Sequence, residues 1–91
     1  MIAVPTTSGT GSEATRTAVI TDTEKNVKFV LASLFLLPTN VILDPELTLS
    51  MPPKVTAATG MDALVHSLEA YVTATAHPIS DRVGRTGFML I

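Results

Sequence analysis

The sequence predicts a chain of mixed α/β class, in which a β-rich first half precedes a helical second half. Two stretches rich in β-branched and apolar residues, 15–21 and 27–33, predict a pair of strands. Pro52 and Pro53 mark a boundary, because proline is well tolerated in the first turn of a helix. Beyond them, apolar residues recur at the i, i+3, i+4, i+7 spacing of an amphipathic helix. We therefore place a seam near residue 52.

The first half is predicted to contain short strands joined by turns. The apolar run at its start ends at Pro5 and is typical of the end of a buried strand, and the two β-rich stretches flank a turn-like "DTEK" and favour a hairpin. The expected elements are a strand end at Met1–Val4, a loop at 6–12, hairpin strands at 15–21 and 27–33 around a turn at 22–25, a further strand at 39–45 and a short helical turn near 46–49.

The second half is predicted to contain one long helix from about Pro53 to Thr75, and Pro78 stops anything longer. Its apolar stripe includes Leu64, Leu68 and Tyr71. Residues 81–91 are an alternative start for another helix, but "GRTGFMLI" is a poor helix sequence, because its two glycines, Gly84 and Gly87, each cost about 1 kcal/mol relative to alanine.

Composition narrows the class of protein. Of the 91 residues, 46% are hydrophobic and only 15% are charged, which suits part of a larger buried body better than a free-standing small domain. The net charge of −2 gives nucleic-acid binding little support, and the absence of cysteine excludes disulfides and thiolate metal sites. No signal peptide and no apolar run of about 18 residues is present. We expect a cytoplasmic protein without membrane or nucleic-acid partners.

The segment "VPTTSGTGSEA" contains a match to the dinucleotide fingerprint G-x-G-x-x-A at Gly9, Gly11 and Ala14. In that fingerprint an α-helix begins directly after the glycine loop, because the helix N-terminus binds the pyrophosphate. Here the β-like "TRTAVITD" follows, so we predict that the match is accidental in its usual sense. Glycines and hydroxyls still allow close backbone approach and hydrogen bonding to a ligand. The alternative is an ordinary solvated turn.

A second group of polar residues lies in "GMDALVHSLEAY". Asp62 and His66 are four residues apart, so on a helix they share one face, which Glu69 and Thr73 also occupy. A carboxylate and an imidazole in that arrangement can bind one metal ion, with chemistry that suits Fe(II), Zn²⁺ or Mn²⁺. The alternative is a surface ion pair worth about 0.5 kcal/mol. His77, the other histidine, lies beyond the helix beside Pro78 and is expected to be a loop residue.

Taken in order, "AVPTTSGTGSEAT", "KF", "ILDPELTLSMPP" and "TAATGMDALVHSLEAYVT" resemble the iron-containing (group III) alcohol dehydrogenases over residues 2–81. The resemblance implies an incomplete dehydroquinate synthase-like fold. Residues 1–51 would be the C-terminal part of a Rossmann-like NAD(P)-binding domain, and 52–91 the start of an all-helical metal-binding domain.

The resemblance also implies site residues. Asp62 and His66 match the first two of the family's four metal ligands, for Fe(II) or alternatively Zn²⁺. The positions that match the family's NAD or NADP cleft are Thr6, Thr7, Thr10, Val19, Lys28 and Leu47. No separate catalytic residue is implied. The reaction would be hydride transfer between the cofactor and a small primary alcohol, diol or the matching aldehyde, in an enzyme whose full-length relatives form homo-oligomers.

Parts of the family pattern are missing. The pyrophosphate-binding glycine–serine segment and the two remaining histidine ligands would lie outside residues 1–91, and "RVGRTGFMLI" departs from the alanine- and leucine-rich helix expected there. We therefore expect an internal fragment, truncated or frameshifted at its end, that is inactive alone. The alternatives are a non-catalytic fragment that binds a partner, and a piece of a zinc-dependent glycerol dehydrogenase.

Overall fold

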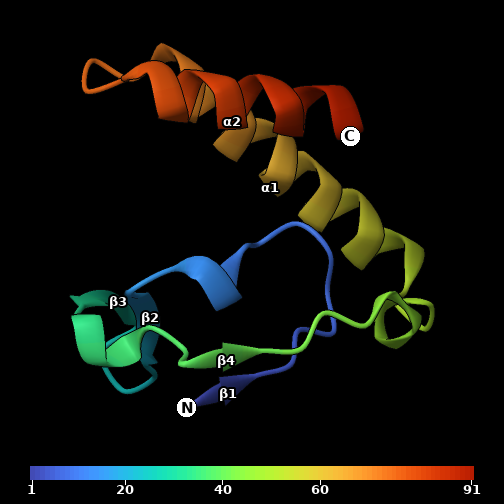
Figure 1. Cartoon of the computed structure of the whole chain (residues 1–91). Helices are drawn as coiled ribbons and strands as arrows, with labels where there is room; N and C mark the ends of the chain where they lie inside the picture. The colour runs from blue at the N-terminus through green and yellow to red at the C-terminus, as the bar shows by residue number, and fades with distance from the viewer. The chain divides into compact units, whose positions relative to one another are not determined.

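The computed structural model describes all of residues 1–91, and the chain divides into two compact units. The first unit comprises Met1–Thr6 and Gly11–Leu47, and the second comprises Thr7–Thr10 and Thr48–Ile91. The short segment Thr7–Thr10 thus belongs with the helices, although it is flanked in sequence by strands. Figure 1 shows the elements of each unit.

The first unit contains two small sheets. Strands β2 (Thr17–Asp22) and β3 (Val27–Ala32) pair antiparallel, with Thr17 opposite Ala32 and Asp22 opposite Val27 (Figure 1). The predicted hairpin is therefore confirmed. Its turn forms because the Asp22 carboxylate accepts the backbone N–H groups of Glu24 and Lys25, each at 3.0 Å, and Asn26 takes the left-handed conformation at φ 52°.

The second sheet of this unit is short and parallel. Strand β1 (Ile2–Ala3) pairs with β4 (Asn40–Val41), so the strand expected at 39–45 is only two residues long. The chain beyond Val41 leaves the sheet and enters the predicted helical turn, a 3₁₀ helix at Pro45–Thr48. Two further 3₁₀ helices lie at Ser12–Ala14 and Leu34–Leu36.

The second unit is built on helix α1 (Pro53–Val72), which begins at the predicted proline and ends three residues before the predicted Thr75. Pro53 occupies the first helical position. A backbone N–H at that position has no acceptor within the helix, so proline, which lacks this N–H, costs no hydrogen bond there.

The prediction for residues 81–91 is wrong, because Pro78–Leu90 forms a second helix, α2. His77 begins it: the imidazole Nδ1 accepts the Ile79 N–H at 3.2 Å, and the Ser80 hydroxyl accepts the His77 N–H at 2.9 Å. Both bonds satisfy donors that a helix start leaves unpaired.

Helix α2 packs on α1 through the two glycines whose low helix propensity disfavoured a helix in this segment. A Cβ on Gly84 would lie 2.8 Å from the Ser67 carbonyl oxygen, and one on Gly87 would lie 2.5 Å from the Ser67 hydroxyl. Gly84 is the buried residue of this helix. The tertiary contact therefore overrides the low helix propensity of glycine.

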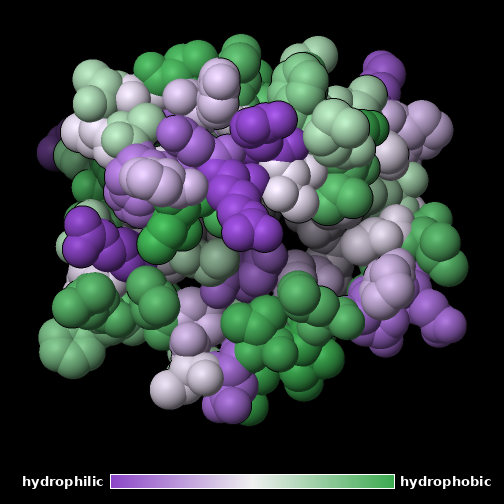
Figure 2. Space-filling view, turned by 45° about the horizontal axis from the view of Figure 1, so that its top comes forward, coloured by the Kyte–Doolittle hydropathy of each residue, from purple (hydrophilic) through white to green (hydrophobic).

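No hydrophobic side chain in the structure is buried, although 46% of the residues are hydrophobic. Phe35 is 97% exposed and Met89 is 84% exposed. Figure 2 shows apolar side chains, in green, spread among polar ones over the face in view. Exposed apolar surface on this scale is typical of surfaces that bind other polypeptide.

We predict that Gly84→Ala destabilises the α1–α2 pair by about 1 kcal/mol. Alanine gains about 1 kcal/mol of helix propensity, but overpacking against a main-chain carbonyl costs about 1–3 kcal/mol. Gly87→Ala is the matched control, because it meets a hydroxyl that can rotate away, and it is expected to be neutral or stabilising. Urea unfolding followed by helical circular dichroism measures both variants. Equal effects of the two substitutions would contradict the packing argument.

Candidate functional site

Asp62 and His66 occupy successive turns of α1. The Asp62 Oδ2 and His66 Nδ1 atoms are 3.8 Å apart, and the two side chains are 46% and 57% exposed, respectively. Two donors that each bind an ion at about 2.1 Å can lie at most about 4.2 Å apart, so this pair is within reach of a single metal. The carboxylate–imidazole chemistry also fits Fe(II) or Zn²⁺.

The pair alone does not make up a metal site. The structure contains no cluster of three or more His, Cys, Asp and Glu side chains that could hold a metal ion. The same two accessible groups form a weak i, i+4 ion pair only when the imidazole is protonated. The two alternatives predicted from the sequence, a metal-binding pair and a surface ion pair, thus concern the same two side chains, with and without a bound ion.

Helix α2 packs on α1 next to the face that carries Asp62 and His66. Gly84 of α2 meets the Ser67 carbonyl and the Ala70 side chain of α1. Ser67 is five residues from Asp62, which places it about 140° around the helix. Ala70 is one turn after His66 and about 40° around the helix, so α2 packs beside the candidate ligands, which stay 46% and 57% exposed.

The threonine loop lies against α1 inside the second unit. Gly9 has a φ of +138°, which side chains disfavour, and its Cα faces the main chain of Thr59. Thr7 and Thr10 therefore belong to the same unit as Asp62 and His66, whereas Thr6 belongs to the first unit. After the loop come a 3₁₀ helix and then β2, so the dinucleotide fingerprint lacks the α-helix that it needs, as predicted.

Val19 and Lys28 lie on one face of the β2–β3 hairpin. Val19 is opposite Val30, and Lys28, two residues from Val30, is opposite Thr21. Since side chains alternate along a strand, all four point to the same side of the ribbon. Leu47 lies in the 3₁₀ helix Pro45–Thr48 and is 40% exposed.

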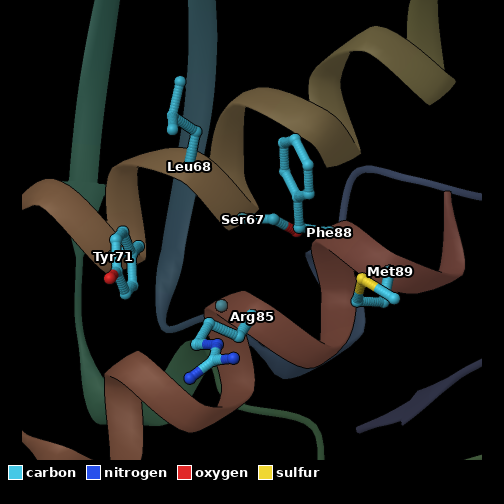
Figure 3. A pocket seen from close by; sticks show the side chains of 7 residues that line it. Ser67, Leu68, Tyr71, Arg85, Phe88 and Met89 are labelled. Carbon is cyan, nitrogen blue, oxygen red and sulfur yellow. The ribbon is translucent and has the colours of Figure 1, made fainter.

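The cleft between α1 and α2 is separate from these residues. It has a volume of about 340 Å³, and Figure 3 shows the side chains around it. Its lining residues are Ser67, Leu68, Tyr71, Gly84, Arg85, Phe88 and Met89. None of the candidate site residues borders this cleft.

Sequence reasoning missed three contributions to this arrangement: the Gly9 contact with α1, the glycine packing face of α2, and the cap at His77. The spacing of Gly84 and Gly87, three residues apart on one helical face, was a usable signal for close helix packing. The Gly9 contact had no local signal, because its partner lies fifty residues further along the chain.

Solved structures with the same arrangement of elements define the fold class. A crystal structure of 1,3-propanediol oxidoreductase matches with a TM-score of 0.83 and 51% identity, over 91% of this chain and 22% of that one. Sulfoacetaldehyde reductase from Bifidobacterium kashiwanohense, in complex with NAD⁺, matches with a TM-score of 0.87 and 44% identity over the same shares. The described elements are therefore part of the fold that these oxidoreductases share.

Family comparison then specifies the group. Residues 1–45 match the model described as iron-containing alcohol dehydrogenase, and residues 56–91 match the C-terminal model of the Fe-containing alcohol dehydrogenase family. The chain belongs to the iron-containing alcohol dehydrogenase family. The match continues to residue 91, so the family pattern does not stop at residue 81 as expected, and the proposed departure of the last ten residues is wrong.

Curated relatives are similar along the whole chain. The 1-propanol dehydrogenase of Salmonella typhimurium is 48% identical over 90 residues, covering 99% of this chain and 24% of the relative. The 1,3-propanediol dehydrogenase of Klebsiella pneumoniae is 48% identical over 91 residues, covering 100% of this chain and 24% of the relative. The chain thus spans about a quarter of the length of these relatives.

No helix in the structure combines the length and the apolar character that crossing a membrane requires.

We predict that Asp62→Ala and His66→Ala each change the free energy of unfolding by no more than about 0.5 kcal/mol in metal-free buffer. The lost ion pair is worth about 0.2–0.5 kcal/mol, and alanine recovers a similar amount in helix propensity. Urea unfolding in the presence of a chelator measures both variants. A loss of 2 kcal/mol or more, on the order of breaking a buried network, would show that the pair is structural.

Proposed function

We propose that these 91 residues form part of a metal-dependent, NAD(P)-linked alcohol dehydrogenase that interconverts small primary alcohols or diols and their aldehydes. The observation that carries the proposal is the Asp62–His66 pair on α1, in one compact unit with Thr7–Thr10, within a chain of this family. The names of relatives, which include propanol and propanediol dehydrogenases, support the substrate class.

The two parts of the chain are assigned different tasks. We assign residues 1–51 to the NAD(P)-binding domain and 52–91 to the helical metal-binding domain, in keeping with the separate family matches at 1–45 and 56–91. The NAD⁺ complex of the sulfoacetaldehyde reductase supports NAD as the cofactor. The family description supports iron, with Zn²⁺ as the alternative.

Asp62 and His66 are the residues that would hold the metal. When bound, the ion supplies Lewis acidity to the substrate oxygen and the nicotinamide accepts or donates hydride. Their accessibility leaves the remaining coordination positions open to further ligands and to substrate. Because both ligands lie on one helix face, they would hold the substrate oxygen in a fixed position beside the cofactor, which favours the reaction.

The proposed cofactor-binding residues are of two chemical kinds, polar or charged and apolar. Thr6, Thr7 and Thr10 offer hydroxyls that donate or accept hydrogen bonds. On the hairpin, Lys28 presents a cation beside the apolar Val19 on one face, which suits an anionic dinucleotide with a flat apolar ring. Leu47 adds a further apolar surface, 40% exposed.

Transplantation of these 91 residues tests the proposal. The matched segment of the Klebsiella pneumoniae 1,3-propanediol dehydrogenase is replaced by this chain, which it resembles over its full length. We expect NAD⁺-dependent oxidation of 1,3-propanediol that a chelator abolishes and Fe(II) restores. Asp62→Ala and His66→Ala are each expected to lower kcat/KM by at least about 100-fold, because a first ligand matters more than its supporting shell.

Glu69→Gln is the matched control for that experiment. Glu69 is on the same helix at seven residues from Asp62, so it shares the face, but it matches no ligand position. Its substitution is expected to leave activity within about twofold, a change of about 0.4 kcal/mol in the barrier. Full activity of Asp62→Ala, or an equal loss in Glu69→Gln, would overturn the assignment of the metal ligands.

We predict that Lys28→Gln in the transplant raises the KM for NAD⁺ about tenfold with little change in kcat. One charge-assisted hydrogen bond to an anionic group is worth about 1.5–3 kcal/mol, and binding that is equal in ground and transition states affects KM alone. Lys25→Gln, in the hairpin turn, is the control and is expected to leave KM unchanged. An unchanged KM in Lys28→Gln would remove Lys28 from the cofactor cleft.

A further inference from the structure

The threonine loop contacts helix α1 at Gly9. A Cβ added there would overlap the Thr59 carbonyl oxygen, and would lie 2.6 Å from the Thr59 carbonyl carbon and 3.1 Å from its Cβ. The φ of Gly9, +138°, is also one that residues with a side chain rarely adopt. Glycine is therefore required at this position for two independent reasons.

The partner of this contact is held rigidly. Thr59 lies within α1, so its carbonyl belongs to the hydrogen-bonded backbone of the helix. Its hydroxyl donates to the Val55 carbonyl one turn earlier at 3.0 Å, which fixes the side chain along the helix. A clash at Gly9 must therefore be relieved by movement of the loop.

Thr59 is on the face of α1 that carries the candidate metal ligands. Thr59, Asp62 and His66 have the spacing i, i+3, i+7, which places them in one row on consecutive turns. The loop thus meets α1 one turn before Asp62, with Thr7 and Thr10 on either side of the contact. Both Gly9 and Thr59 belong to the second unit.

From this geometry we infer that Gly9 and Thr59 are positioning residues, whose direct backbone contact sets the distance between the cofactor-binding threonines and the metal-binding face of α1. The inference rests on the proposed function. Neither residue needs to touch cofactor or substrate. With no side chain at Gly9, the loop lies in direct contact with the helix backbone. This distance matters because a dinucleotide bound by the loop and an alcohol bound at Asp62 and His66 must be close enough for hydride transfer.

The expected size of the effect follows from the overlap. Gly9→Ala must displace the loop by about 1 Å to restore ordinary contact with the Thr59 carbonyl, and a misplacement of that order costs about 100-fold in rate. Thr59→Ala does not relieve the clash, since the obstructing atoms are main chain. Gly9→Ala/Thr59→Ala is therefore expected to be as impaired as Gly9→Ala.

Gly11→Ala is the matched control. Gly11 has a φ of +61° but nothing within 4 Å of an added Cβ, so alanine there adds backbone strain without a clash. We measure kcat, the KM for NAD⁺ and the deuterium isotope effect on kcat in the transplanted enzyme, with 1,3-propanediol deuterated at both alcohol carbons. Gly9→Ala is expected to lose about 100-fold in kcat/KM and to show a larger isotope effect than its parent, because hydride transfer becomes rate-limiting. Gly11→Ala is expected to lose less than about tenfold, with an unchanged isotope effect.

Three results decide the matter. An inactive parent transplant overturns the proposed function and, with it, this inference. An active parent in which Gly9→Ala and Gly11→Ala behave alike overturns the inference alone. A loss in Gly9→Ala with unchanged KM and isotope effect also overturns it, because that pattern reports a lower fraction of folded enzyme rather than a misplaced loop.

Discussion

The second unit depends on direct contact between the main chain of glycines and the backbone of helix α1. Gly84 lies on the Ser67 carbonyl and Gly9 lies on the Thr59 carbonyl. Each contact brings a second segment to within backbone distance of the helix, one from α2 and the other from the threonine loop. The two contacts are eight residues apart along α1, about 12 Å, and Asp62 and His66, which lie between them, stay exposed.

Hydrophobic burial is incomplete throughout this arrangement. With no apolar side chain buried, the ordering of the chain relies on helix and hairpin hydrogen bonds, caps and glycine contacts. Each of those is worth only about 1 kcal/mol net, whereas fixing the backbone of one residue costs about 1–2 kcal/mol. Additional apolar contacts would add to this stability, and the relatives, about four times as long, contain many more residues to supply them.

The sequence predicted the local elements better than the contacts between them. The hairpin, the proline start of α1 and the 3₁₀ turn after Asp44 follow from residues near each other in the chain, where turn chemistry and helical spacing act directly. Helix α2 was missed because Gly84 and Gly87 lower helix propensity, and only their packing on Ser67 explains their presence. The Asp62–His66 pair was visible from spacing alone, whereas the grouping of Thr7–Thr10 with α1 depends on a contact between distant residues.

The β2–β3 hairpin has a consequence for solubility. As a two-stranded sheet, it leaves one edge of each strand with backbone groups that pair with no strand of the chain. Such edges invite edge-to-edge association, and β3 is an apolar strand, Val27–Ala32, in which every residue is exposed. Lys28 is the single charged residue of that strand. The lysine proposed to face the cofactor thus also acts as the gatekeeper that discourages the exposed strand from joining a neighbouring molecule's sheet.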